Sequence, residues 1–415
     1  MRGIAWYSKI EVRRMLLLAG IWLCSFLFVL FQGGKLSLML LMIVTILSGY
    51  ILSGRWSGIQ DVQLKRRLVA TEAKEPVIPA GTSVKVEMDM VLPGVWPVLY
   101  VLVKDELRSK NGERYAFETS IVPDWKRRGH LQYVTPPLKR GRYVFGETIC
   151  STEDLFGYME HQGKVVIEQG LRVVPRMISI PAWKLPEERG RGYRHQAAST
   201  MMLKETTQID GVRDYVYGDR LSRIHWNASA RTGSWKSKEY EKESMPRVLL
   251  CLDQQSKSYT HARQFERGVS VVASILKYVN RQQMHTHLQL MSDTQTQQQA
   301  VSFSKGAHHF DQMLEKLIDV TLEPGPDFAL TVKGLADPLL AHSLCVVVSG
   351  RTDERMHEAL RYMQHRQATV CYVLLEEGNE AAASSFHAKL QAEGMLAYRI
   401  RSLEELPLVM GGRLA

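Results

Sequence analysis

The chain has 415 residues, of which 45% are hydrophobic and 23% charged, and its formal net charge is +10. This composition excludes a largely disordered protein, and the length suits two soluble domains with additional segments. The five cysteines are widely spaced and form no Cys-x-x-Cys pair. A disulfide framework or a structural zinc site is therefore not expected, and the cysteine usage is typical of a reducing compartment.

Two uncharged apolar runs, residues 15–31 and 36–53, stand close to the N-terminus and are separated by a short Gly-Gly turn. Each is near the roughly 17–25 residues that a helix needs to cross a bilayer. We expect a membrane hairpin over residues 1–58; a cleaved signal peptide followed by one helix is the alternative. Basic residues precede the first run and follow the second, whereas the loop holds only Lys35. The positive-inside rule then predicts a multi-pass cell-membrane protein with both termini in the cytoplasm.

Residues 59–180 contain short apolar or alternating segments separated by Pro and Gly, as at Val84–Met88 and Val98–Val103. This pattern is typical of an antiparallel β-sandwich or an open barrel. Asp154 to Gly157 is expected to be a structural turn rather than part of a ligand site. Residues 181–210 show no periodicity and are expected to be a linker that either stays solvated or touches lipid or a partner through its arginines.

Residues 211–243 are the densest charged and aromatic stretch of the chain. From Glu205 to Glu243 there are seven Lys/Arg and seven Asp/Glu, so the charge is balanced. Asp219 suits the N-cap of a helix over residues 220–231, Gly233 suits its end, and residues 234–241 look extended. Balanced charge argues against nucleic-acid binding and favours internal ion pairs. We expect three arginines of this stretch to form bidentate pairs with carboxylates and to set how the domains meet: Arg213, Arg223 and Arg231.

The same stretch carries a family signature. It consists of four motifs: an Arg-acid-Tyr, a Gly-Asp, an Arg-Ile-His-Trp and an Ala-Arg. The signature residues in these motifs are Arg213, Asp214, Tyr215, Gly218, Asp219, Arg223, His225, Trp226 and Arg231. Together these motifs resemble the bacterial domain-of-unknown-function family fifty-eight (DUF58). The resemblance extends upstream to Arg140-Gly141 and Asp154–Gly157. The family is named for the absence of an assigned activity, so the resemblance implies architecture more than chemistry.

Residues 244–415 alternate between apolar strands and amphipathic helices, which predicts a doubly wound α/β domain. Its topology resembles the von Willebrand factor A fold, where the family is usually placed. That fold often carries a metal site beginning Asp-x-Ser-x-Ser. Here Asp253 is followed by Ser256 and Ser258, each one place out of register, with Lys257 between them. We expect no metal or other cofactor, and Mg²⁺ at this degenerate site is the alternative.

No phosphate-binding GxxxxGK[ST] motif is found, and no catalytic Cys–His or Ser–His–Asp arrangement is visible in the sequence. His225 is interpreted as a packed structural group. We therefore expect a membrane-anchored cytoplasmic scaffold or adaptor that contacts membrane lipid and a protein partner, and not an enzyme. The family resemblance implies a MoxR-type AAA ATPase as that partner, in membrane or envelope complex assembly. The alternative is an enzyme of unknown type using the charged cluster of residues 213–243.

Overall fold

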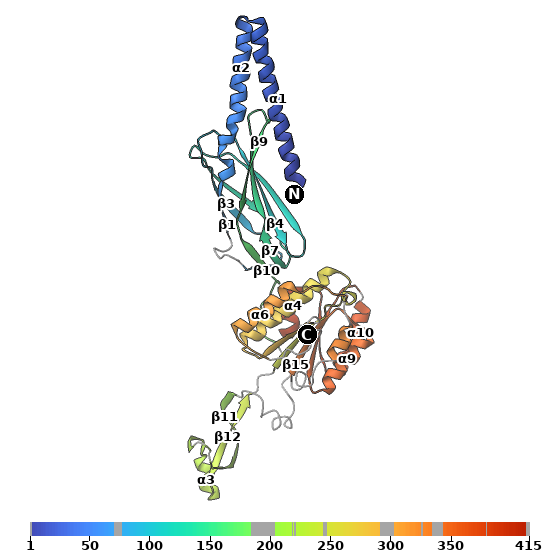
Figure 1. Cartoon of the computed structure of the whole chain (residues 1–415). Helices are drawn as coiled ribbons and strands as arrows, with labels where there is room; N and C mark the ends of the chain where they lie inside the picture. The colour runs from blue at the N-terminus through green and yellow to red at the C-terminus, as the bar shows by residue number, and fades with distance from the viewer. Residues whose placement is uncertain are drawn as a thin grey trace. The chain divides into compact units, whose positions relative to one another are not determined.

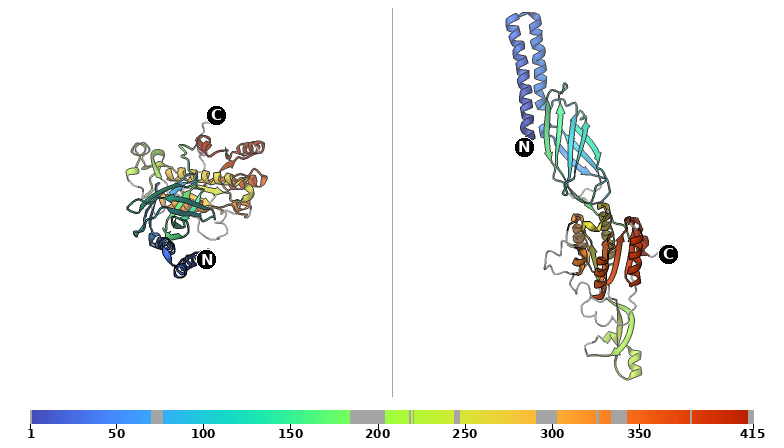
Figure 2. Two further views of the ribbon diagram at one scale, coloured as in Figure 1. Left: turned by 90° about the horizontal axis from the view of Figure 1, so that it is seen from above. Right: turned by 90° about the vertical axis from the view of Figure 1, so that its right-hand side faces the viewer.

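The computed structural model describes residues 2–69, 77–183, 204–217, 219, 221–243, 247–290, 303–324, 327–333, 343–378 and 380–411. The chain divides into two compact units, Met1–Val174 and Pro175–Ala415. Some of their elements are labelled in Figure 1, and two further directions are shown in Figure 2. Most of the expected linker and Gly218 lie outside the described residues.

The first unit begins with an antiparallel pair of helices, α1 (Arg2–Gln32) and α2 (Gly34–Ser53). Only Gly33 separates them, and its φ of 61° is one that glycine adopts without a steric penalty. The segments Val12–Gln32 and Gly34–Ser53 are long and apolar enough to cross a membrane. The two expected spans are therefore helical, and α1 continues for about three further turns before its apolar part.

Among the described residues of this unit, ten strands follow two short 3₁₀ helices, η1 (Gly54–Ser57) and η2 (Ile59–Asp61). They are β1 (Gln63–Leu68), β2 (Val77–Pro79), β3 (Lys85–Val91), β4 (Val101–Ser109), β5 (Arg114–Ile121), β6 (Arg128–Val134), β7 (Gly141–Phe145), β8 (Glu147–Glu153), β9 (Glu160–Val166) and β10 (Gly170–Val174). One sheet has the order β1-β3-β6, and the other the order β2-β10-β7-β4-β8-β9 with β5 also paired to β4. All pairs are antiparallel except β2 with β10.

The two sheets share one apolar core, as the expected sandwich requires. Met88 and Met90 of β3 lie in the same buried cluster as Val101 and Leu107 of β4. This core also contains an ion pair, because Arg66 of β1 donates to Asp105 of β4 over 2.7 Å. The two side chains are 0% and 2% exposed. A buried charge pair thus joins one sheet to the other.

The second unit contains a parallel sheet of the order β14-β13-β15-β16-β17. The strands are β13 (Arg247–Leu252), β14 (Thr286–Gln289), β15 (Ser343–Ser349), β16 (Thr369–Leu375) and β17 (Leu396–Ile400). The described helices around the sheet are α4 (Ala262–Arg281), α6 (Ala307–Asp319), α7 (Phe328–Lys333), α9 (Glu354–His365), α10 (Glu380–Ala392) and α11 (Leu406–Gly411). The expected doubly wound architecture is confirmed in this coarse form; the strand expected at residues 300–303 lies almost wholly outside the described residues.

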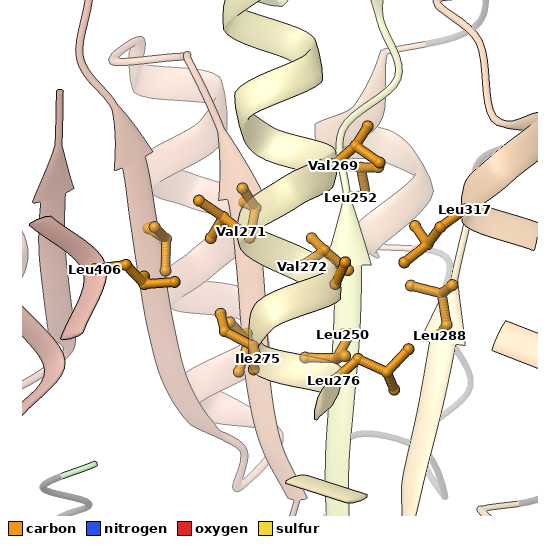
Figure 3. Close-up of a cluster of buried hydrophobic side chains, with 14 of the residues drawn as sticks. Leu250, Leu252, Val269, Val271, Val272, Ile275, Leu276, Leu288, Leu317 and Leu406 are labelled. Carbon is orange, nitrogen blue, oxygen red and sulfur yellow. The ribbon is translucent and has the colours of Figure 1, made fainter. Parts of the chain in front are cut away.

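Alternate residues of each strand face opposite layers, so the sheet is covered on both sides. Leu250 and Leu252 pack under α4, α6 and α11, whereas Leu249 and Cys251 face α7, α9 and α10. Figure 3 shows the first of these layers, with the side chains of α4 inserted over β13. The apolar face expected for this helix, from Phe265 to Leu276, is buried there.

The segment expected to open the linker is instead part of the second unit. Trp183 is buried and stacks edge-on against Tyr278 of α4, with ring centroids 5.9 Å apart. Arg281 donates to the carbonyl of Ile180 over 2.8 Å. At its other end the expected linker runs into strand β11 (Lys204–Asp214). The sequence lacked a periodic signal here because one buried side chain, that of Trp183, is too little to show a period.

Candidate functional sites

The carboxyl end of the parallel sheet is the first candidate site, because ligands of such folds bind where the strand order reverses. The reversal lies between β13 and β15, since the chain passes from β13 to β14 and then to β15 on the other side. Asp253 follows β13 and Ser349 ends β15. The Ser349 hydroxyl donates to Oδ2 of Asp253 over 2.7 Å, and the backbone N–H of Gln255 donates to Oδ1 over 2.9 Å. Asp253 is fully buried, and burial raises the pKa of its carboxyl.

Arg351 places a positive charge beside the strand ends, where an acidic side chain would be needed to help bind a cation. Arg351 forms ion pairs with Asp327 and Asp353, and its guanidinium also donates to Gln255 over 3.2 Å. Of the two candidate serines, Ser256 is exposed and Ser258 is buried.

Within the described ranges, no group of three His, Cys, Asp or Glu side chains has a geometry that could hold a metal. The arrangement favours a structural hydrogen-bond network around Asp253 over a hard-cation site.

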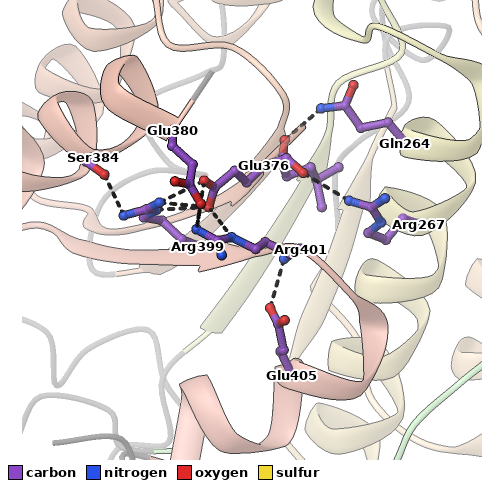
Figure 4. Close-up of polar contacts among 9 residues, drawn as sticks. Gln264, Arg267, Glu376, Glu380, Ser384, Arg399, Arg401 and Glu405 are labelled. Atoms are coloured by element: carbon purple, nitrogen blue, oxygen red, sulfur yellow. Dashed lines mark hydrogen bonds and ion pairs between the residues drawn. The ribbon is translucent and has the colours of Figure 1, made fainter. Parts of the chain in front are cut away.

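A second polar network lies at the carboxyl end of β16 (Figure 4). Glu376 is 5% exposed in its side chain and accepts three bonds from Arg399, at 2.8, 2.9 and 3.1 Å. Arg401 also pairs with it over 3.3 Å. Burial alone would raise the pKa of Glu376, but the two guanidinium groups outweigh burial and lower it. A carboxylate held this firmly charged suits structure better than proton transfer.

The family signature forms the second candidate site, a hairpin that we call the signature arm: residues 204–217, 219 and 221–243. Its strands β11 and β12 (Lys236–Glu243) pair antiparallel, with Asp214 opposite Lys236. Residues 215–235 connect the strands and fold back on them. Ile224 forms a bridge with Ser237, and both residues are buried.

The helix expected over residues 220–231 is wrong in its bounds. The described residues form a 3₁₀ turn, η4 (Leu221–Arg223), and then a short helix, α3 (Trp226–Thr232). The N-cap is His225, whose Nδ1 accepts from the N–H of Ala228 over 3.1 Å. Asp219 instead accepts from the N–H of Val216 and from a neighbouring arginine. The end of the helix is as expected, because Gly233 has a φ of 69° and donates back to Ser229.

Two ion pairs within the arm involve signature residues. Arg213 donates to Asp219 over 2.8 Å, and Lys236 donates to Asp214 over 2.5 Å. The bond from Arg213 lowers the pKa of Asp219. Internal pairing was therefore a sound expectation for part of the arm. Arg231 is exposed, and its pairing with a carboxylate stays a prediction.

The arm also exposes large apolar side chains, which the sequence pattern did not predict. Tyr217 is fully exposed and Trp226 is 67% exposed. Val216, Leu221 and Trp235 are exposed as well. Among the signature aromatics, Tyr215 is the one that packs inward, with its ring 5.5 Å from that of Trp235. Aromatic spacing alone did not reveal the surface, because only the fold-back of residues 215–235 decides which rings are buried.

Comparison with known proteins supports the family resemblance. Residues 211–383 match the family described as "Protein of unknown function DUF58". The chain is similar to the uncharacterized protein YeaD of Bacillus subtilis, at 23% identity over 99% of this chain and 98% of that protein.

Two solved structures show weak similarity to the chain. One is the CARDB domain of a Pyrococcus furiosus protein in complex with di-metal ions, with 16% identity, 28% of this chain and 88% of that chain covered, and a TM-score of 0.18. Another is the DNA-bound alkylpurine DNA glycosylase AlkC of Pseudomonas fluorescens, with 13% identity, 36% of this chain and 42% of that chain covered, and a TM-score of 0.17. Such TM-scores carry no argument about fold. The resemblance read from the signature is thus confirmed for residues 211–383, which match DUF58.

Proposed function

We propose that the protein is a membrane-anchored cytoplasmic scaffold or adaptor whose signature arm binds a protein partner. The observation that carries the proposal is the number of exposed large apolar side chains on the arm, among them Tyr217, Leu221 and Trp226. Tyr and Trp side chains contribute most of the binding energy at many protein interfaces. An arm with seven Lys/Arg and seven Asp/Glu has no net charge and presents these rings without a strong net field.

The anchoring part of the proposal rests on the helices α1 and α2. The basic residues around the hairpin would place both termini, and with them the second unit, on the cytoplasmic side. We further propose that the second unit is related to the von Willebrand factor A fold, because Asp253 stands at the end of the first strand of a parallel sheet. The DUF58 resemblance then favours a MoxR-type AAA ATPase as the partner.

The enzyme alternative needs an unpaired acid, base or nucleophile in the arm. His225 uses Nδ1 to cap α3, and Asp219 accepts bonds from Arg213 and Val216. Each of these groups already serves the local fold. This pairing favours a binding role over general acid–base chemistry.

Affinity capture with purified components tests the proposal. The full chain in detergent is immobilised and mixed with the MoxR-type ATPase from the same organism, with and without ATP and Mg²⁺. We expect capture by the wild type and its loss in Trp226→Ala and Leu221→Ala. The control Leu408→Ala removes a half-exposed leucine from α11 of the same unit and should leave capture unchanged. No capture by the wild type would reject the ATPase as the partner, and equal capture by all variants would reject the arm as the binding surface.

A further inference from the structure

A second exposed apolar surface lies in the first unit, and we call it the apolar rim: Trp56, Val95, Val122, Trp125, Leu155 and Phe156. Trp125 is fully exposed and Val95 is 92% exposed. The six side chains come from η1 and from the loops β3–β4, β5–β6 and β8–β9. Such a gathering of large apolar groups is unusual on a solvated surface and marks an interaction site.

Strand register places the three loops at one end of the sandwich. Val101 at the start of β4 pairs with Ile121 at the end of β5, and Leu102 pairs with Ser151 near the end of β8. The opposite end of β4 leads into a turn of exposed polar residues, Lys110 to Gly112. The rim is therefore confined to one end of the domain.

That end adjoins the apolar helices. The ring of Tyr50 in α2 lies 6.0 Å from that of Trp96 and 6.2 Å from that of Phe156. Arg14 of α1 donates to the carbonyl of Tyr158 over 2.7 Å, and the Tyr158 hydroxyl donates back to the Arg14 carbonyl over 3.0 Å. Both helical residues lie within one turn of the outer ends of the apolar segments. The loop 154–158 is thus held level with the ends of the two candidate spans.

Arg127 fixes the other two loops to the same place. Its Nε donates to the carbonyl of Leu92 over 3.1 Å, and its terminal nitrogens donate to the carbonyls of Ser57, Pro93 and Trp96. Close packing reinforces this attachment at Gly58, where an added Cβ would lie 1.6 Å from the Pro93 oxygen. The loops are therefore rigidly attached to the exit of α2.

The β8–β9 loop is also fixed from within. The Asp154 carboxylate accepts from the N–H groups of Phe156, Tyr158 and Met159, at 2.8, 3.1 and 2.7 Å. Gly157 completes the turn with a φ of 64°. The expectation of a structural turn at residues 154–157 agrees with this geometry. Its consequence is that Leu155 and Phe156 are held outward.

We propose that the apolar rim lies in the headgroup region of the bilayer, so that the β-domain binds the lipid surface beside its own anchor. The proposal rests on the membrane anchoring proposed above. Tryptophan is enriched at the membrane–water interface, and apolar side chains level with the ends of the spans enter the same layer. Exposed cations accompany the rim and complement anionic headgroups: Arg13, Lys126 and Arg128. The β-domain is then fixed against the membrane surface and does not swing freely from the hairpin.

Fluorescence quenching on the full chain in phosphatidylcholine–phosphatidylglycerol vesicles tests this inference. Bimane is attached to Val95→Cys, to Val122→Cys or to the control Lys110→Cys, each in a Cys24→Ser background. The other four cysteines are buried and do not compete for the label. A nitroxide on the lipid headgroup probes contact with the interface, and acrylamide probes access to water.

We expect the nitroxide to quench the labels at positions 95 and 122, with loss of acrylamide quenching relative to position 110. Acrylamide quenching equal to that at position 110 would overturn the proposal. Shielding from both quenchers would also overturn it, since a protein partner would then cover the rim. A bimane label on native Cys24 in α1 tests whether the anchor is in the bilayer, because a nitroxide on the lipid acyl chain should then quench it. Quenching at Cys24 without quenching at positions 95 and 122 rejects the rim alone, whereas no quenching at Cys24 rejects the membrane anchor.

Discussion

Replacing Arg66 by Met should destabilise the β-domain strongly, because it leaves a buried carboxylate without its cation. The Asp105 side chain is 2% exposed, and Arg66 is its charge partner at 2.7 Å. The Thr148 hydroxyl donates to the same carboxylate over 2.9 Å, and the Tyr133 hydroxyl also donates to it. These neutral donors remain in the variant but cannot replace the lost positive charge.

Removing one member of a buried ion pair costs about 3–5 kcal/mol. Because 1.4 kcal/mol is a factor of ten, a loss of about 3 kcal/mol raises the open population about 100-fold. The double variant Arg66→Met/Asp105→Leu removes both charges and should regain most of that stability. The contrast between the single and the double variant is therefore a sharper test than either alone.

Hydrogen exchange followed by mass spectrometry measures this effect within one unit. Peptides from β3 and β4 should exchange about 100-fold faster in the single variant, under conditions where exchange follows the opening equilibrium. Peptides from β13 and β15 belong to the other unit and serve as the internal control. Unchanged exchange in the single variant, or equal acceleration in both variants, would refute the reasoning.

Three further predictions concern the strand ends and the exit of α2. Burial raises the pKa of Asp253, so this carboxyl contributes stability that is present below about pH 3.8 and is lost as pH rises toward its folded pKa. Asp253→Asn should therefore unfold at a higher temperature than the wild type at pH 7, and an advantage seen only near pH 4 would contradict this. The pKa of Glu376 is lowered, so this carboxylate contributes stability that is full above about pH 4.5 and is lost as pH falls further. Arg399→Gln should therefore weaken the dependence of the unfolding temperature on acid pH. A pH profile equal to that of the wild type would count against the network. Gly58→Ala should lower the free energy of unfolding by more than about 1 kcal/mol, because Gly58 has a φ of 73° and an added Cβ would clash with Pro93. Proteolysis of residues 92–100 should therefore be faster in this variant. Wild-type resistance to protease would show that the contact is not rigid.

The sequence predicted the elements whose signal is local. Val346 to Val348 form a continuous apolar run, and the strand that contains them is buried on both faces. The helix α4 followed from apolar residues at helical spacing. Periodicity is sufficient in these cases because burial of one face or both faces decides the local structure.

Tertiary contacts between residues 6 to 96 positions apart decided the features that the sequence did not reveal. Asp219 was a good N-cap by residue type, but its carboxylate bonds to Arg213, and Ile224 pairs with Ser237 across the arm. Asp253 finds its hydroxyl partner 96 residues away at Ser349. No local pattern indicates such partners, and the pairing of Arg66 with Asp105 was invisible for the same reason.

The apolar rim illustrates the same limit at the level of a surface. Val95, Val122 and Phe156 are single apolar residues in three loops, and each one alone needs no explanation. Only the strand register brings the three loops to one end of the sandwich. The surface is therefore a property of the fold and not of any one segment.

The most direct test of the adaptor proposal is site-specific photo-crosslinking at Tyr217 in living cells. The full chain carries benzoylphenylalanine at position 217 or, as a control, at position 110 of the β-domain, and adducts are identified by mass spectrometry. The adaptor account predicts a MoxR-type AAA ATPase crosslinked from position 217 and not from position 110. Absence of the ATPase from adducts at position 217, with the protein present in the membrane fraction, would contradict the central claim.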